Sequence, residues 1–232
     1  MKRFVLVSVL LMFVFVSLGT AQSKFQVGVN FVPMFPQGGF KDQIDGMGWG
    51  GALNFTYRIP RSILSVGASL GYYIYGYRSR FEPLSMTIPD VLVKVSTTNA
   101  VVTGHVFIRL QPLRGSLQPY LDGLVGFQHL TTDTRIHLEN DYDDGYPSSN
   151  HWRDTVLSYG LGGGLMILLT RQSQNRSRFS VSLDMGFRYL MGGSAEYLTK
   201  DAIEVIGDEV FYYVSESRTD IATARFGVIF SF

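Results

Sequence analysis

The 232-residue sequence has no cysteine, few charged side chains and no long apolar run beyond its first residues. Without cysteine the chain cannot form disulfides, use a thiol nucleophile or carry a lipid on an N-terminal cysteine. Charged residues are only 17% of the chain and the net charge is +1, which argues against nucleic acid as a partner. After residue 21 no apolar run reaches the roughly 18 residues of a spanning helix, so helical spanning is excluded there.

The N-terminal residues have the pattern of a secretory signal peptide. Lys2 and Arg3 precede an apolar run over residues 4–18, and small residues follow up to Ala21. The run is shorter than the about 20 residues that a spanning helix needs, so cleavage is favoured over a retained anchor. We therefore predict a signal peptide over residues 1–21 and one mature domain over residues 22–232.

Period-two alternation of apolar and small or polar residues recurs along the mature chain, which indicates strands. The last segment shows it most clearly, because Phe226, Val228, Phe230 and Phe232 share one face. Each alternating segment exceeds the about 9–11 residues that cross a bilayer as a tilted strand. The sequence therefore predicts an all-β, eight-stranded antiparallel up-and-down transmembrane β-barrel. The expected strands cover residues 25–35, 48–59, 63–77, 93–110, 117–130, 155–169, 179–191 and 220–232.

Charge placement predicts which face of each strand points outward. No lysine lies in the middle of an expected strand, and every glutamate lies in a long connection. A soluble barrel would alternate too, but its exterior would carry many of both residues. Because Arg or Lys facing lipid at the bilayer midplane costs about 2–4 kcal/mol, the bulky apolar face is predicted to face lipid. The aromatic residues expected at the membrane interfaces are Trp49, Tyr57, Tyr72, Tyr159 and Tyr189.

Short and long connections alternate along the predicted barrel. The long ones carry most of the acidic residues, including Asp141, Asp143, Asp144 and Asp208, and the short ones carry arginine and no acid. Short turns on the periplasmic side and longer loops outside are typical of such barrels. Residues 90–98 and 209–215 alternate and are rich in β-formers, so we expect them to continue strands above the bilayer and offer an exposed sheet edge.

A few charged side chains fall on the predicted inward face. If Leu110 faces Leu117, then His105 and Asp122 lie opposite each other. Such a pair could orient an imidazole for base catalysis, but no third group has a recognisable spacing, so a structural pair is favoured. Because unpaired buried charge is unfavourable, we expect ion pairs, Asp184 with Arg225 among them, and no wide pore. The predicted lumen network comprises Arg58, His105, Arg109, Asp122, Asp184, Arg188 and Arg225.

No catalytic, cofactor or metal site is predicted. The stretch from Asp141 to Gly145 superficially resembles a calcium loop, but the twelfth position is Trp152 instead of a bidentate acid. The glycines of residues 160–164 lie in an expected strand with no helix after it, so they form no phosphate cradle. The remaining histidines, His129, His137 and His151, have no metal-ligand spacing.

The chain resembles the outer-membrane protein β-barrel family, the small barrels similar to the OmpA transmembrane domain and to the OmpX and opacity-type proteins. The resemblance rests on residues 26–30, 118–126 and 225–232 and covers essentially all of the mature chain. The last segment resembles the C-terminal strand that barrel-insertion machinery reads. The resemblance implies the outer membrane of a Gram-negative bacterium, with lipid as partner, termini in the periplasm and long loops outside.

That family has no shared catalytic residues, so no enzyme is predicted. The favoured function is a structural or interaction barrel that displays long acidic loops at the cell surface, where they can meet a protein partner. The alternative is a narrow channel for ions or small solutes, because ion pairs can leave a thin polar path. A lipid-modifying enzyme that uses His105 is the third and least favoured reading.

Overall fold

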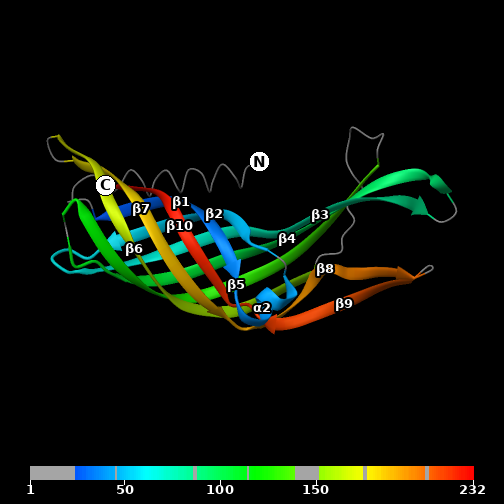
Figure 1. Ribbon diagram of the computed structural model, residues 1–232. Helices are drawn as coiled ribbons and strands as arrows, with labels where there is room; N and C mark the ends of the chain where they lie inside the picture. The colour runs from blue at the N-terminus through cyan, green and yellow to red at the C-terminus, as the bar shows by residue number, and fades with distance from the viewer. Residues whose placement is uncertain are drawn as a thin grey trace, which may run out of the picture.

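The computed structural model describes residues 24–44, 46–85, 88–113, 115–138, 152–174, 177–206 and 209–232. The signal peptide expected over residues 1–21 lies outside these ranges. Almost all of the described chain forms antiparallel strands (Figure 1). The elements are β1 (Phe25–Pro36), α2 (Gly38–Gln43), β2 (Gly48–Arg58), β3 (Leu64–Ser85), β4 (Ile88–Leu110), β5 (Leu117–Leu138), β6 (Trp152–Gln174), β7 (Ser177–Gly192), β8 (Ser194–Ile206), β9 (Glu209–Arg218) and β10 (Ile221–Ser231).

Eight strands close into an antiparallel barrel in the order β1-β10-β7-β6-β5-β4-β3-β2. Strands that follow one another in the chain are neighbours, apart from β8 and β9, which form a separate two-stranded sheet. The barrel closes where β1 meets β10, with Val29 opposite Val228 and Phe31 opposite Phe226. The predicted eight-stranded up-and-down barrel is confirmed, with the alternating terminal segment as its closing strand.

Large apolar side chains cover the outside of the barrel, and small or polar ones fill its inside. Phe31 and Leu161 on the outside are 55% and 70% exposed, whereas the inward-facing Asn30 and Ser158 are 2% and 0% exposed. Water would disfavour so much exposed apolar surface, whereas lipid solvates it. A closed barrel also pairs its backbone groups internally, as a bilayer requires. The barrel is therefore a transmembrane barrel with its apolar face outward, as predicted.

Aromatic side chains gather at both ends of the apolar belt. Near the short turns the ring centroids of Phe25 and Tyr57 are 5.1 Å apart, and those of Phe179 and Phe232 are 5.5 Å apart. Amphipathic rings at the two boundaries of an apolar belt are typical of the membrane–water interface. At the other end the outward-facing aromatic residues are Trp49, Tyr72, Tyr159 and Tyr189.

The two ends of the barrel differ in shape. The short-turn end holds the β2–β3, β4–β5 and β6–β7 connections, and there Phe25 and Phe232 exchange backbone hydrogen bonds of 3.4 and 2.9 Å. At the other end strands run beyond the barrel as two arms (Figure 1). The sheet arm consists of residues 77–85 of β3, 88–98 of β4 and 133–138 of β5, and the hairpin arm consists of β8 and β9.

The arms depart in part from the sequence expectation. Residues 90–98 continue β4, as predicted. Residues 209–215 do not continue a barrel strand, because they belong to β9, which pairs with β8 alone. The connection expected over residues 192–219 is therefore mostly a hairpin. Alternation is the same in any strand, so it could not show which partner these residues pair with.

The connection expected over residues 36–47 contains the short helix α2. Gly38 has φ +55° and Gly46 has φ +106°, a backbone region that glycine enters without strain. These two residues let the chain turn inward and return, which places α2 against β1 and β9. Among the described residues, no helix has the length and apolar character to span a membrane.

Candidate functional site

Asp122 on β5 lies at the centre of a charge network inside the barrel. Arg109 on β4 faces it and donates twice, from Nε to Oδ1 at 2.7 Å and from Nη2 to Oδ2 at 2.9 Å. Arg188 Nη2 donates to the same Oδ2 at 3.1 Å, and Arg225 Nη1 lies 3.8 Å from it. All of these side chains are buried. One carboxylate is therefore shared by three guanidinium groups. Its contact with Arg109 has the bidentate geometry that is typical of arginine–carboxylate pairs.

Asp184 on β7 is the second carboxylate of the network. Arg225 Nη2 donates to its Oδ2 at 2.7 Å, and Asn30 Nδ2 donates to the same atom at 2.9 Å. The Tyr120 hydroxyl donates to Oδ1 at 2.6 Å. The two carboxylate oxygens thus have three donors from different strands, which meets the requirement that a buried charge be paired and hydrogen-bonded.

Arg188 joins the network to the opposite wall of the barrel. Its Nη1 donates to Ser69 Oγ at 3.0 Å, so β7 is linked to β3 across the lumen. Aromatic faces surround the cations as well. Arg109 Cζ lies 3.8 Å from the centre of the Tyr120 ring, and Arg188 Cζ lies 5.4 Å from that of Phe107. Cation–π contacts of this kind stabilise a desolvated guanidinium.

The predicted pairing of His105 with Asp122 is wrong. In the β4–β5 ladder His105 faces Gly126, and Asp122 faces Arg109. The ladder is displaced by four residues relative to the expected register. Both side chains still point inward, because a displacement by an even number of residues keeps each on its face.

The connection between β4 and β5 explains this error. The expectation placed Leu110 opposite Leu117, whereas Leu110 faces Leu121. Residues 117–120 pair with β6 and not with β4. Pro119 has no N–H to donate to a ladder, so the β4–β5 pairing begins beyond it.

His105 bonds instead to a serine that sequence reasoning did not single out. Its Nε2 lies 3.1 Å from Ser158 Oγ, and Gln128 Nε2 donates to the same oxygen at 3.0 Å. A serine within reach of a histidine is one requirement of nucleophilic catalysis. Ser158 is fully buried, however, and among the described residues no carboxylate is bonded to His105. The geometry fits a packed hydrogen-bond cluster, and its structural role stays a prediction.

A polar layer lies between the network and the short-turn end. Arg58 Nη2 donates to Gln111 Oε1 at 2.8 Å and to Gln118 Oε1 at 3.3 Å. Gln26 Nε2 donates to Ser231 Oγ at 3.2 Å beside the closing seam. Arg58 therefore belongs to this polar layer and is distinct from the arginines that contact Asp122.

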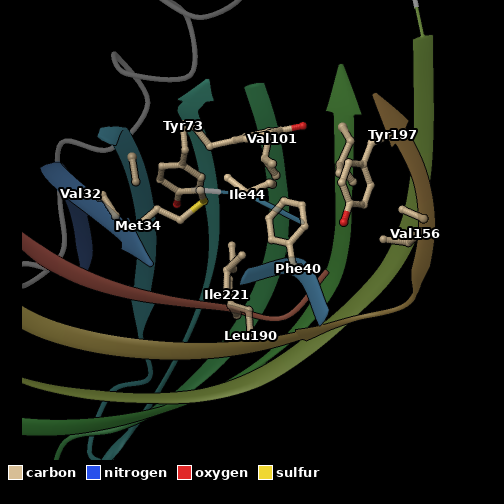
Figure 2. Packing of buried hydrophobic residues seen from close by; sticks show 14 of the residues in the cluster. Val32, Met34, Phe40, Ile44, Tyr73, Val101, Val156, Leu190, Tyr197 and Ile221 are labelled. Atoms are coloured by element: carbon tan, nitrogen blue, oxygen red, sulfur yellow. The ribbon is translucent and has the colours of Figure 1, made fainter. Parts of the chain in front are cut away.

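An apolar cap closes the mouth that faces the arms. Phe40 on α2 is completely buried, with its ring centroid 5.5 Å from that of Tyr75 and 5.2 Å from that of Tyr197. Figure 2 shows Phe40 pointing from α2 into the middle of this cluster. The cap continues the inward faces of the barrel strands beyond the charge network. Its other members include Val32, Met34, Ile44, Tyr73, Val101, Leu130, Val156, Leu190, Ala195 and Ile221.

Several residues of the lumen were not predicted as partners. Alternation places Asn30, Tyr120 and Ser158 on the inward face, but only the register across strands shows what each one contacts. Phe40 had no signal at all, since a single aromatic residue in a connection is not distinctive. The interior positions were thus readable from the sequence, and the contacts among them were not.

The acidic connections are described only in part. Glu196 and Glu216 are exposed and face each other across the hairpin arm. The stretch from Asp141 to Gly145 lies outside the described residues, as do Glu139, His151 and Asp208. Within the described ranges, no group of three or more His, Asp or Glu side chains is placed to hold a metal.

Comparison with solved structures finds similar folds among surface and outer-membrane proteins. The surface protein NspA of Neisseria is 14% identical at a TM-score of 0.47, over 89% of this chain and 96% of that chain. The attachment invasion locus protein Ail of Yersinia pestis, crystallised with a heparin analogue, is 14% identical at a TM-score of 0.45, over 90% and 97%. A major outer membrane protein of Thermus thermophilus is 13% identical at a TM-score of 0.42, over 90% and 99%.

At these identities and TM-scores, the similarity assigns no role to this chain. No family model matches the sequence, and no curated protein matches it at a significant level.

Proposed function

We propose that the protein is a non-enzymatic barrel of the bacterial outer membrane that displays its arms and long acidic loops at the cell surface. Its role there is structural or is to bind another protein. The observation that carries the proposal is that β3, β4 and β5, the strands of the sheet arm, contain 22 or 23 residues each. About 9–11 residues suffice to cross a bilayer, so regular sheet continues well beyond the apolar belt.

The filled lumen supports display over transport. The inside of the barrel holds, in order, a polar layer, a charge network and an apolar cap, and each contains buried side chains. A narrow eight-stranded barrel has just enough room for such a filling. Solutes would have to displace Phe40 and separate the ion pairs around Asp122, so a channel is the weaker proposal.

Display at the surface can be tested by inserting an epitope between Ser85 and Ile88, at the tip of the sheet arm. We expect antibody to label intact cells. A matched insertion after Arg61, in the β2–β3 turn, should be labelled only after the outer membrane is permeabilised. Labelling of the second site alone in intact cells would contradict the proposed orientation.

The channel alternative is tested separately by single-channel recording in planar bilayers. The proposal predicts no steady openings from the wild-type protein, because both the cap and the charge network block the lumen. Steady openings that require the folded protein would favour the channel over the display function.

A further inference from the structure

The charge network of the lumen contains more cations than anions. Arg109, Arg188 and Arg225 are between 1% and 5% exposed, and only Asp122 and Asp184 oppose them. His105, the next ionisable side chain, is either neutral or a further cation. The buried network therefore carries at least one positive charge without a counter-charge, an arrangement that is strongly unfavourable in a site without water.

Among the described residues, no carboxylate other than Asp122 and Asp184 is paired with these three arginines. Residues 59–63, 111–116 and 170–178, which form the short turns, contain no Asp or Glu, and neither do residues 1–24. Toward the arms the network is covered by the apolar cap, whose described members include Val32, Val101 and Leu190. No acidic side chain is therefore present in the short turns, and within the described ranges the cap lies between the network and the arms.

Two donors of the network also lack an acceptor. Among the described residues, Arg188 Nε and Arg225 Nε are buried and have no hydrogen-bond partner. The two arginines lie on the adjoining strands β7 and β10, where Arg188 faces Thr223 and Arg225 faces Gly186. Both reach Asp122 Oδ2, at 3.1 and 3.8 Å, so the two guanidinium groups lie close together. The surplus charge and the free donors thus coincide.

We propose that the lumen binds a small monovalent inorganic anion, such as chloride, at the guanidinium groups of Arg188 and Arg225. The bound ion supplies the missing negative charge and accepts from the two free Nε–H groups. It enters from the short-turn end, where the lumen is lined by Arg58, Gln111 and Gln118 and no acid. The cap makes the site a blind one, so anion binding does not require a conducting channel.

The test compares melting temperatures of the folded protein in detergent, in sodium chloride and in sodium gluconate of equal ionic strength. Gluconate is too large for the packed lumen. A saturable ligand of the folded state raises Tm, and for a chain of this size we expect chloride to add about 2–4 °C beyond the general effect of the salts. The general effect of the two salts on Tm is measured with the two variants described next, in which the network needs no bound ion.

Two variants remove the need for the ion in different ways. Arg188→Gln removes the surplus cation, and Ser69→Asp adds a carboxylate beside Arg188, whose Nη1 lies 3.0 Å from Ser69 Oγ. In both, the extra chloride effect should disappear. Arg218→Gln is the matched control, because Arg218 is exposed and bonds to Asp220 outside the network. This control should keep the wild-type response.

A second measurement on the wild type covers the case in which a variant does not fold. Broadening of the ³⁵Cl resonance by the folded protein should be reversed by nitrate or bromide and not by gluconate. The proposal is overturned if the chloride response of Tm is the same in wild type and in either folded variant, or if folded protein leaves the ³⁵Cl line width unchanged. Water molecules in place of the ion would give these negative results.

Discussion

Asp122 links β5 to three other strands of the barrel, because three guanidinium groups contact its carboxylate. Asp122→Asn removes the charge and leaves the arginines buried with less compensation. We expect the free energy of unfolding to fall by about 3–5 kcal/mol, measured by urea unfolding in lipid vesicles. Glu216→Gln, on an exposed side chain, should change it by less than about 0.5 kcal/mol. Equal stability of the two variants would show that the network contributes little.

His105 gives a prediction that separates a structural role from a catalytic one. Among the described residues, His105→Ala leaves Ser158 bonded to the side chain of Gln128 alone, which we expect to lower stability by about 1–3 kcal/mol. The folded band on gels should therefore convert to the unfolded band at a lower temperature, and lipid turnover should be absent from both proteins. Unchanged heat resistance, or lipid turnover that His105→Ala abolishes, would contradict the structural role.

At the scale of single residues, the sequence was informative about direction and uninformative about contacts. Arg109, Asp122, Asp184, Arg188 and Arg225 all point inward, because an inward position follows from period two alone. Their partners follow from the register between strands, which depends on the turns. The β4–β5 register differs by four residues from the expected one, beginning near Pro119. As a result, Asp122 pairs with Arg109, and His105 bonds to Ser158.

Among the elements, β5 contains a pair of glycines that tests how closely the strands approach. A Cβ on Gly126 would collide with the carbonyl oxygen of Gly104 on β4, whereas a Cβ on Gly123 would meet nothing within 4 Å. Gly126→Ala should therefore destabilise the barrel by about 1–3 kcal/mol through overpacking. Gly123→Ala should be neutral within about 0.5 kcal/mol. Comparable urea midpoints for the two variants would mean that β4 and β5 do not approach as closely as the structure shows.

The helix α2 is held by one large side chain. Phe40→Ala removes a fully buried ring between Tyr75 and Tyr197, a change that costs up to about 3–5 kcal/mol where the site cannot collapse. Since α2 is short, we expect it to leave the mouth, with faster hydrogen exchange of the amides of residues 38–43 and little change in the barrel strands. Lys41→Ala, on the exposed side of the helix, is the control. Retained protection of these amides in Phe40→Ala would show that α2 does not depend on the cap.

The barrel strands were predictable as elements, and the structures between them were not. Alternation located all eight barrel strands and the upward continuation of β4. It gave no sign of α2, whose six residues contain no helical period, and it could not separate β9 from a barrel strand. Contacts between distant segments determine both structures. β9 pairs with β8, and α2 is held in place by the contact of Phe40 with the apolar cap.

For the whole molecule, the sequence indicated the architecture because every strand obeys the same inside–outside rule. The layered filling of the lumen and the two arms result from contacts between distant segments, such as Asn30 with Asp184 and Phe40 with Tyr197. These contacts decide between a display barrel and a channel, and the alternation that reveals the barrel is common to both.

The most direct test of the transmembrane barrel is a nitroxide scan along residues 156–162 of β6 in lipid vesicles. Each label is attached to a single introduced cysteine, and the chain has no cysteine of its own that would also be labelled. The structure predicts high collision rates with oxygen and low rates with an aqueous nickel complex at Leu157, Tyr159 and Leu161. The intervening positions, Ser158 and Gly160, should be poorly accessible to both reagents. Loss of this period of two, or ready access of the nickel complex to the leucine positions, would show that the apolar face does not meet lipid.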